Sequence, residues 1–476
     1  MPTIERRPGT KMLKVTPKTP VFPLLLTIIA ATLWSPAYAG AGETTTPPEK
    51  EDLTVDEILD REIARTDPDY VVYRPGSVDG STFDTGNEHF LVFDGPDGSL
   101  MAVWTQSSYE GKGDHRIMFS RSEDEGVTWS EPLRIVGPAR PGDGYMASWG
   151  FPLISKSGRI YVIWNQYQGI DDVVHQHTGT MDGCYSDDMG KTWSKPETIP
   201  MKRSPYDHTD PKVPSNWIVW QKPIRDLDNK WFTGFSRWVS KAVRTPPHIN
   251  SWTAWETVVE FMRFENIDDD PEPKDIQITY SAWGDEALRV PHYDNPDLSI
   301  AQEPSLVRLP DDRLFCTMRT MSGYIWYSLS SEDGRTWCNP RPLLRRDHGL
   351  PIPEPLCCCP IYEYAEGRYV LLHHNNDGHF EGSKREETSK NRRPAFIALG
   401  EYHPDAEQPI WFSESKEIFD NDGVGIGPLT RIDCGVYPSV TKRNGNFVLW
   451  HPDRKFFLLG KKITDEWLST LEVPAD

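Results

Sequence analysis

The motif SEDEGVTW at residues 122–129 recurs as SDDMGKTW at 186–193 and as SSEDGRTW at 330–337. In such a motif the Ser and Asp side chains can bind nearby backbone N–H groups, Gly accepts a positive φ, and the Trp ring can be buried where a strand begins. Each copy therefore predicts a β-hairpin turn with an aromatic anchor. Three copies in one chain indicate a repeat architecture.

Short β-rich segments surround the motif in a constant order. An opening strand and a Gly- or Asp-bearing turn precede two further strands, the motif and a closing strand. The first two copies start 64 residues apart and the second and third 144 apart, so a unit without the motif is expected between them. Six units can be counted, with opening strands expected at 90–93, 150–154, 217–220, 304–307, 359–362 and 437–440. Six four-stranded units in an all-β chain predict a six-bladed β-propeller, which leaves only short, protected sheet edges.

The first 39 residues differ from the rest of the chain. Five basic residues precede an apolar run at 21–34, and residues 37–39 (Ala-Tyr-Ala) place small side chains at the two positions that a signal peptidase reads. The run is short for a membrane span and contains Pro23. We therefore expect a secretory signal cleaved after Ala39, and a secreted or periplasmic protein without a membrane span.

A short segment is expected between this signal and the propeller. Residues 40–80 are assigned to a linker and one helix, and residues 81–476 to the propeller. The linker at 40–50 is rich in Thr, Pro and Gly, and the apolar residues of 52–65 follow helical spacing. Residues 239–300 are the least regular part and are expected to hold long loops of the third blade.

The charge balance excludes some partners. The chain has 71 acidic and 51 basic residues and a formal net charge of −20, and removal of residues 1–39 would leave about −24. Nucleic acid and anionic membrane surfaces are poor partners for so acidic a protein. An anionic ligand would need a local basic pocket.

Neither a metal nor a cofactor is expected. All seven cysteines follow residue 39, and some could pair in an oxidising compartment. The run at 357–359 (Cys-Cys-Cys) favours a buried strand over a metal or redox site, because no second Cys/His cluster at ligand spacing accompanies it. The histidines of 373–379 (HHNNDGH) favour a polar loop at the pocket rim over a cation site. The sequence does not reveal an oligomeric state.

The repeated motif resembles the Asp-box, or BNR repeat, of the sialidase superfamily, and the resemblance covers roughly residues 81–470. It implies a sialidase-like propeller in which the Asp-boxes lie at the periphery and serve structure. In that family a Tyr nucleophile is activated by a Glu, three Arg side chains bind the substrate carboxylate, and an Asp is the general acid/base.

The repeat register predicts which side chains face the centre. The residue about nine positions before the first turn of each unit is expected at the start of the innermost strand, where the blades converge. These residues are Glu88, Trp149, Trp220, Glu303, Cys358 and Tyr437. Charged, aromatic and hydroxyl groups are thus expected around one small site, and the two Trp rings would suit stacking on sugars.

The resemblance also assigns roles to residues 303–319. This segment, EPSLVRLPDDRLFCTMR, is similar to the family segment in which a Glu opens one strand and an Arg closes the next. It implies Glu303 as the activating base and Arg319 as a carboxylate-binding residue. Read without the family, the same two residues could form a structural ion pair.

Two further segments match the family. Arg393, with Arg392 as the alternate, precedes the strand expected at 395–399 as the third Arg of sialidases does. The segment GVYPS at 435–439 is similar to the one that carries the nucleophile, which implies Tyr437 in that role. A buried core ring with a satisfied hydroxyl is the structural alternative for this tyrosine.

The opening strand departs from the family. Where sialidases have Arg-Ile-Pro, residues 87–89 read Asn-Glu-His, so that the carboxylate of Glu88 replaces a guanidinium and His89 stands beside it. The nearest counterpart of the acid/base Asp is Asp114. An acid at Glu88 would repel a substrate carboxylate unless it is protonated or paired. A different sugar, attacked with Glu88 and Glu303 as a carboxylate pair, is therefore an open alternative.

Three functions remain open from the sequence. The leading one is an exo-acting glycoside hydrolase acting on a glycan, expected to be anionic, with Tyr437 as nucleophile, Glu303 as its activator and Glu88 or Asp114 as acid/base. The second is a uronate polysaccharide lyase, in which a Tyr or His removes the proton α to the carboxylate and Arg stabilises the enolate-like charge. The third is a non-catalytic glycan-binding propeller.

Overall fold

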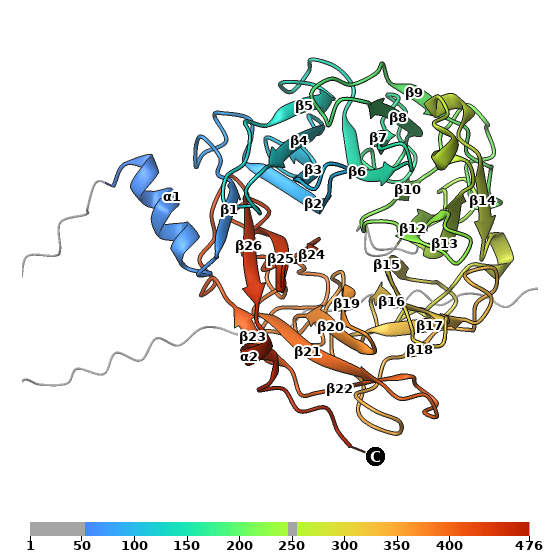
Figure 1. Cartoon of the computed structure of the whole chain (residues 1–476). Coiled ribbons are helices and arrows are strands. Elements are labelled where there is room, and N and C mark those ends of the chain that lie inside the picture. The colour runs from blue at the N-terminus through green and yellow to red at the C-terminus, as the bar shows by residue number, and fades with distance from the viewer. Residues whose placement is uncertain (1–52, 246–254, 476) are drawn as a thin grey trace, which may run out of the picture. The chain divides into compact units, whose positions relative to one another are not determined.

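The computed structural model describes residues 53–245 and 255–475. Six antiparallel sheets are arranged radially around a common centre (Figure 1). This arrangement confirms the expected all-β, six-bladed propeller. The expected signal peptide and the linker at 40–50 lie outside the described residues.

The first five sheets follow one another along the chain. The first consists of β2 (Gly86–Asp94), β3 (Leu100–Ser107), β4 (Arg116–Ser122) and β5 (Leu133–Val136). The second consists of β6 (Ala147–Ile154), β7 (Ile160–Gln166), β8 (Thr180–Ser186) and β9 (Glu197–Ile199). The third consists of β10 (Trp217–Ile218), β11 (Ile224–Arg225), β12 (Trp231–Trp238), β13 (Thr257–Phe264) and β14 (Ile278–Ser281). The fourth consists of β15 (Ala301–Arg308), β16 (Leu314–Thr320), β17 (Trp326–Ser330) and β18 (Arg341–Pro342), and the fifth of β19 (Ile361–Ala365), β20 (Arg368–His373), β21 (Ala395–Tyr402), β22 (Ile410–Phe412) and β23 (Lys416–Phe419).

The sixth sheet joins the two ends of the propeller. It consists of β24 (Ser439–Arg443), β25 (Asn446–Asp453), β26 (Phe457–Ile463) and β1 (Tyr70–Tyr73), in the order β1-β26-β25-β24. Strand β1 lies within the range expected to be linker and helix. Its four residues carry no periodic signal of their own, and pairing with a strand from the other end of the chain decides its conformation. This pairing closes the ring.

The helices of the described residues are short. Helix α1 (Val55–Ala64) begins after Thr54, whose hydroxyl accepts a hydrogen bond from the N–H of Glu57 at 3.3 Å while the Glu57 carboxylate accepts from the N–H of Thr54 at 2.8 Å. This capping box satisfies backbone donors that the first turn leaves unpaired. Helix α2 (Asp465–Leu468) and the three-residue 3₁₀ helices η2 (Ile267–Asp269), η3 (Pro273–Asp275) and η4 (Gly284–Glu286) are the other helices of the described residues. None of the helices in the described part of the chain has the length and apolar character needed to cross a membrane.

The third blade differs from the expectation for residues 239–300. This range was expected to hold long loops, but β13 pairs with β12 along eight residues and β14 adds a further strand. The blade lacks the Asp-box motif, which explains why its outer strands gave no clear signal in the sequence.

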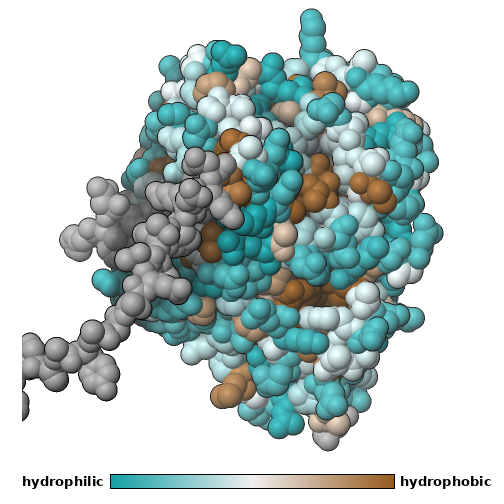
Figure 2. Space-filling model, turned by 90° about the vertical axis from the view of Figure 1, so that its left-hand side faces the viewer, coloured by the Kyte–Doolittle hydropathy of each residue, from teal (hydrophilic) through white to brown (hydrophobic). Residues whose placement is uncertain are grey.

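The hydrophobic core consists of layers between neighbouring blades. Each of six large clusters of buried residues combines side chains from neighbouring sheets, two sheets in five of the clusters and three in the other. In the layer between the first and sixth blades, Phe90 and Trp104 pack with Trp450 and Leu458. Because burial of apolar surface is the main stabilising contribution, each blade depends on both of its neighbours. The face shown in Figure 2 is mostly hydrophilic, with small separate hydrophobic patches.

The Asp-boxes form the turns between the third and fourth strands of their blades. In the first, Asp124 accepts hydrogen bonds from the backbone N–H and the hydroxyl of Thr128, at 2.8 and 2.6 Å, and the Ser122 hydroxyl accepts one from Gly126 at 2.8 Å. The Trp129 indole donates to the Gly126 carbonyl at 3.0 Å. These bonds hold the turn as the motif predicts.

Each Asp-box glycine also packs against an aromatic ring of the preceding blade. A Cβ atom added to Gly126, Gly190 or Gly334 would lie 2.5, 2.2 or 2.3 Å from Trp450, Phe119 or Phe232, respectively. The motif therefore seals the contact between blades in addition to forming a turn.

The seven cysteines are all free thiols, and only Cys338 is exposed. The disulfides that the sequence allowed are not formed.

The Asp-box contact predicts the effect of adding one methyl group. Gly190 and Gly98 have nearly the same φ, +81° and +83°, but only Gly190 has a neighbour within 4 Å of an added Cβ. Gly98→Ala should lower the free energy of unfolding by about 1–2 kcal/mol, the penalty for a left-handed residue with a side chain. Gly190→Ala should cost about 1–3 kcal/mol more, because the methyl group overpacks against Phe119. Urea unfolding of the two variants measures the difference, and equal losses would contradict the sealing role.

Candidate active site

Four inner strands share a backbone irregularity at their starts. In the first, second and fourth blades the pairing with the next strand shifts register by a β-bulge. The bulged residues His89, Trp149 and Glu303 have positive φ values of 53°, 63° and 48°, and Tyr437 before β24 has 63°. Such a conformation costs about 1–3 kcal/mol for a residue with a side chain and is typical of functional sites.

These four residues with positive φ place their side chains together. The hydroxyl of Tyr437 donates a hydrogen bond to Oε1 of Glu303 at 2.9 Å, and its ring lies 4.5 Å from that of His89 and 5.6 Å from that of Trp149. The repeat register thus leads to one central site. In the first blade the bulge puts His89, and not Glu88, at the position equivalent to Glu303.

Tyr437, Glu303 and Arg319 form a closed polar cluster. Arg319 in β16 donates from Nη1 to Oε1 of Glu303 at 2.5 Å and to the Tyr437 hydroxyl at 3.2 Å. All three residues are at most 3% exposed. Burial and the Glu303 carboxylate hold the pKa of Tyr437 well above its usual value, so this phenol is protonated in the free protein.

This cluster lies in the wall of a cavity of about 290 Å³. Its charged and aromatic lining residues come from loops and strands of all six blades, and they are Glu110, Trp149, His175, His177, Trp238, Glu303, Arg319, Arg392, Arg431 and Tyr437. Three guanidinium groups face two carboxylates there. In a protein with a strongly negative net charge, this cavity is the local basic site that an anionic ligand would need.

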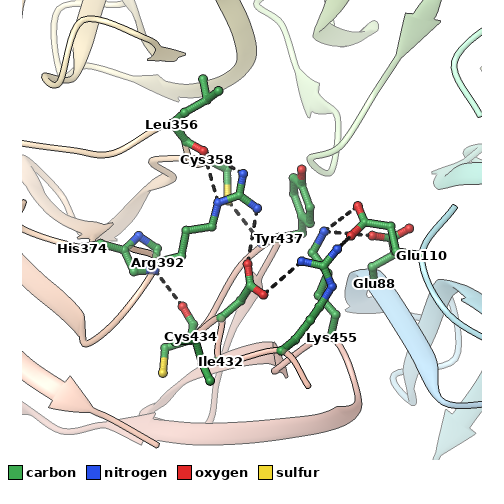
Figure 3. Close-up of polar contacts among 12 residues, drawn as sticks. Glu88, Glu110, Leu356, Cys358, His374, Arg392, Ile432, Cys434, Tyr437 and Lys455 are labelled. Atoms are coloured by element: carbon green, nitrogen blue, oxygen red, sulfur yellow. Dashed lines mark hydrogen bonds and ion pairs between the residues drawn. The ribbon is translucent and has the colours of Figure 1, made fainter. Parts of the chain in front are cut away.

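Arg392 reaches the cavity from the loop before β21. Its guanidinium donates to the carbonyl of Leu356 at 3.2 and 2.7 Å and forms an ion pair with Asp433 at 3.4 Å (Figure 3). Arg393 instead pairs with Asp420 at 2.5 Å and with Glu381 at 3.1 Å, and it does not line the cavity. Of the two arginines that the sequence offered, the structure brings Arg392 into the site.

Glu88 belongs to a buried network beside the cavity. Lys455, in the turn between β25 and β26, donates from Nζ to Glu88 at 3.2 Å and to Glu110 at 2.7 Å (Figure 3). Glu110 also pairs with Arg431, which in turn contacts Asp433 at 3.3 Å. The carboxylate that replaces the family guanidinium is therefore paired with a cation, which removes the repulsion expected for a free acid at this position.

The two carboxylates of this network differ in pKa. Burial and the charge of Glu110 raise the pKa of Glu88 to about 7. Burial also opposes ionisation of Glu110, but Arg431 and Lys455 hold the pKa of that carboxyl well below its usual value. Near neutral pH, Glu88 can hold a proton while Glu110 is ionised.

Asp114, Trp220 and Cys358 lie apart from the cavity surface. Asp114 is fully buried and accepts from the backbone N–H of Ser108 at 3.0 Å and from its hydroxyl at 2.6 Å. The Trp220 indole donates to the carbonyl of Pro304 at 2.9 Å, and its ring packs 6.1 Å from Tyr437. Cys358 accepts a hydrogen bond from the backbone N–H of Tyr437 at 3.2 Å. These residues support the site from behind.

Sequence reasoning missed several lining residues. Glu110 and Arg431 are on loops whose length differs from blade to blade, so the strand register does not reach them. His177 stacks on Trp238 with 4.0 Å between ring centroids, and burial lowers the pKa of His177 to about 3. Trp238 is the last residue of β12, and Arg319 is the last but one of β16, the corresponding strand of the fourth blade. This shared position is the one sequence signal that could have identified Trp238 as a lining residue.

Propeller blades sealed by Asp-boxes and a Tyr–Glu–Arg cluster at the centre define a sialidase-like propeller. The chain belongs to the BNR repeat-like domain family, which matches residues 98–442. No curated protein sequence matches the chain significantly.

Solved structures share the fold. A leech intramolecular trans-sialidase complexed with 2,7-anhydro-Neu5Ac has a TM-score of 0.56 and 14% identity, over 88% of this chain and 73% of that chain. The NanB sialidase from Streptococcus pneumoniae has a TM-score of 0.55 and 12% identity, over 84% and 71%. A protein of unknown function from Dyadobacter fermentans has a TM-score of 0.54 and 12% identity, over 83% and 97%. At these identities the likeness shows the fold alone.

The raised pKa of Glu88 predicts a pH-dependent stability. Between pH 4.5 and about 7 the folded protein keeps a proton on Glu88 that the unfolded chain has released, so the free energy of unfolding falls as pH rises through this window. Glu88→Gln is neutral at every pH and removes this dependence. The stability of the variant relative to wild type should therefore increase by up to about 3 kcal/mol across the window.

Urea unfolding at several pH values measures this difference. Glu123→Gln, which changes an exposed carboxylate of the same blade, is the matched control and should show no comparable trend. A flat difference for Glu88→Gln would contradict the assignment.

Proposed function

We propose that this protein is an exo-acting glycoside hydrolase of an anionic glycan and that it acts outside the cytoplasm. The observation that carries the proposal is the hydrogen bond between Tyr437 and Glu303, 2.9 Å long, in a cavity lined by three arginines. A buried phenol paired with a carboxylate base is suited to nucleophilic attack, and it brings no second negative charge toward an anionic substrate.

Tyr437 would be the nucleophile. Its oxygen would attack the anomeric carbon while its proton moves to Oε1 of Glu303, which already accepts the hydrogen bond. Arg319 would stabilise both oxygens, because its Nη1 atom contacts each of them. Water would then hydrolyse the glycosyl–tyrosine bond, and Glu303 would return the proton to the phenolate.

Glu110 and Glu88 would serve together as the acid/base group. Glu110 lines the cavity and could protonate the leaving oxygen, whereas Asp114, the sequence candidate, is enclosed by Ser108. Glu110 needs a proton first. The pair holds one proton near neutral pH, on Glu88, and Lys455 contacts both carboxylates at 3.2 and 2.7 Å, so movement of this proton to Glu110 within the network would supply it.

Arg319, Arg392 and Arg431 would bind the acidic group of the substrate. All three line the cavity, and a planar guanidinium can bind a carboxylate through two parallel hydrogen bonds. Trp149 and Trp238 provide aromatic surface for the apolar face of a sugar ring. The export signal expected at 1–39 would agree with a substrate outside the cell.

Removal of the phenol hydroxyl should abolish turnover. We expect Tyr437→Phe to lower kcat at least about 10³-fold and Glu303→Gln about 10²–10⁴-fold, because one removes the nucleophile and the other its base. The assay measures sugar release from a panel of sialosides and uronate-containing polysaccharides. Tyr369→Phe is the matched control, since this buried tyrosine bonds to the carbonyl of Arg308 in another part of the fold and should keep full activity.

The products distinguish the proposed hydrolase from its alternatives. Saturated monosaccharides support hydrolysis, unsaturated uronates that absorb in the ultraviolet would identify a lyase, and binding without turnover would identify a glycan-binding propeller. Variants Tyr437→Phe and Glu303→Gln that act on every substrate as well as wild type would refute the site.

The adjacent residues Arg392 and Arg393 allow a matched comparison of two arginine substitutions. Arg392→Lys should raise KM for an anionic substrate about 10-fold, because lysine cannot form the two-point contact that a guanidinium offers. Arg393→Lys should change KM less than about two-fold, since Arg393 lies outside the cavity and pairs with Asp420 and Glu381. Steady-state kinetics on the same substrate compares them. A larger effect from Arg393→Lys would show that the family's third Arg is Arg393 after all.

A further inference from the structure

Two sequence features left without a role converge in the fifth blade. The cysteine run contributes Cys357 and the histidine-rich segment contributes His374, and Glu354 joins them. One ligand atom from each of the three side chains lies within 4.8 Å of the other two. All three residues are at most 2% exposed.

The hydrogen bonds of His374 orient it as a ligand. Its Nε2 atom donates to the carbonyl of Cys434 at 2.8 Å (Figure 3), which leaves Nδ1 with a lone pair in the neutral ring. This Nδ1 atom faces Oε1 of Glu354 at 3.1 Å, and the second carboxylate oxygen accepts from the His374 N–H at 2.7 Å. The lone pair of Nδ1 would thus point at Glu354 beside the Cys357 thiol, and either a proton or a metal ion can bridge these groups.

The donor set selects the kind of cation. Thiolate sulfur, imidazole nitrogen and carboxylate oxygen together suit Zn²⁺, whereas Mg²⁺ and Ca²⁺ prefer oxygen ligands alone. One thiolate and one carboxylate balance the two positive charges of the ion.

We propose that Glu354, Cys357 and His374 bind one Zn²⁺ ion behind the central cavity. The ion fixes the segment 354–358 to His374 at the end of β20, and through the Cys434 carbonyl to the loop before β24. The fourth position belongs to a water molecule or a backbone oxygen. This site does not depend on the proposed hydrolase activity.

The zinc-bound segment supports two residues of the cavity. The carbonyl of Leu356, which lies between Glu354 and Cys357 in sequence, accepts two hydrogen bonds from Arg392. Cys358, which follows the ligand Cys357 in sequence, accepts a hydrogen bond from the backbone N–H of Tyr437. The metal is therefore structural, and it positions Arg392 and Tyr437 without contacting substrate.

The metal content and the cobalt spectrum test the proposal. Full-length protein purified without chelator should contain about one zinc ion per chain, as measured by elemental (inductively coupled plasma) mass spectrometry. Refolding with Co²⁺ in place of zinc should give a thiolate-to-cobalt charge-transfer band in the near ultraviolet. Because the site is buried, refolding with a strong chelator should yield metal-free protein whose Tm is several degrees lower and is restored by Zn²⁺.

Matched variants locate the site. Cys357→Ser should lose the charge-transfer band and most of the zinc, whereas Cys316→Ser, at another buried free cysteine, should keep both. His374→Gln should behave like Cys357→Ser. His373→Gln, which changes a buried neighbour bonded to Ser415 and Pro353, should retain the metal.

Several outcomes would overturn the proposal. One is that the wild-type protein contains no stoichiometric metal and shows no cobalt band. Another is that Cys357→Ser binds as much zinc as the wild type. A Tm that does not respond to chelator would indicate a thiolate–imidazolium pair without metal. If Cys357→Ser fails to fold, the wild-type measurements still decide.

Discussion

Apolar packing between neighbouring blades is the contact on which the rest of this structure depends. No blade has a core of its own, and each buries its surface against the two beside it. The aromatic ring beneath each Asp-box glycine extends this packing to the periphery. A ring closed in this way can hold backbone conformations that an isolated strand would relax, such as the left-handed residues at the starts of the inner strands.

Charge pairing imposes a second constraint at the centre. Glu303 with Arg319, and Glu88 and Glu110 with Lys455, are groups that would be costly to bury alone. Each therefore fixes the geometry of its partner. The result is a site whose polar groups are held before any ligand arrives, which is the condition under which electrostatic stabilisation of a reacting group is most effective.

Local patterns in the sequence were sufficient for the fold and for part of the site. The Asp-boxes fix the turns, and the register between them points to Trp149, Glu303 and Tyr437. Nine positions before Gly98 is His89, as nine before Gly158 and Asp312 are Trp149 and Glu303, so the choice of Glu88 was one residue away from the register that the bulged strands share. The choice between Arg392 and Arg393, like the meeting of Cys357 with His374, depends on contacts between distant segments. A pattern within one strand does not contain that information.

The pairing of β1 with β26 determines when the protein can become complete. The last sheet contains strands from both ends of the propeller, so it can form only after the final strands have been synthesised. Earlier blades can assemble on one another during translation, since their strands are consecutive in the chain. Tyr437 lies at the start of that last sheet and meets Glu303 from the fourth. An unfinished chain would thus contain the carboxylate without the phenol, and the central site would arise in the same late step that closes the ring.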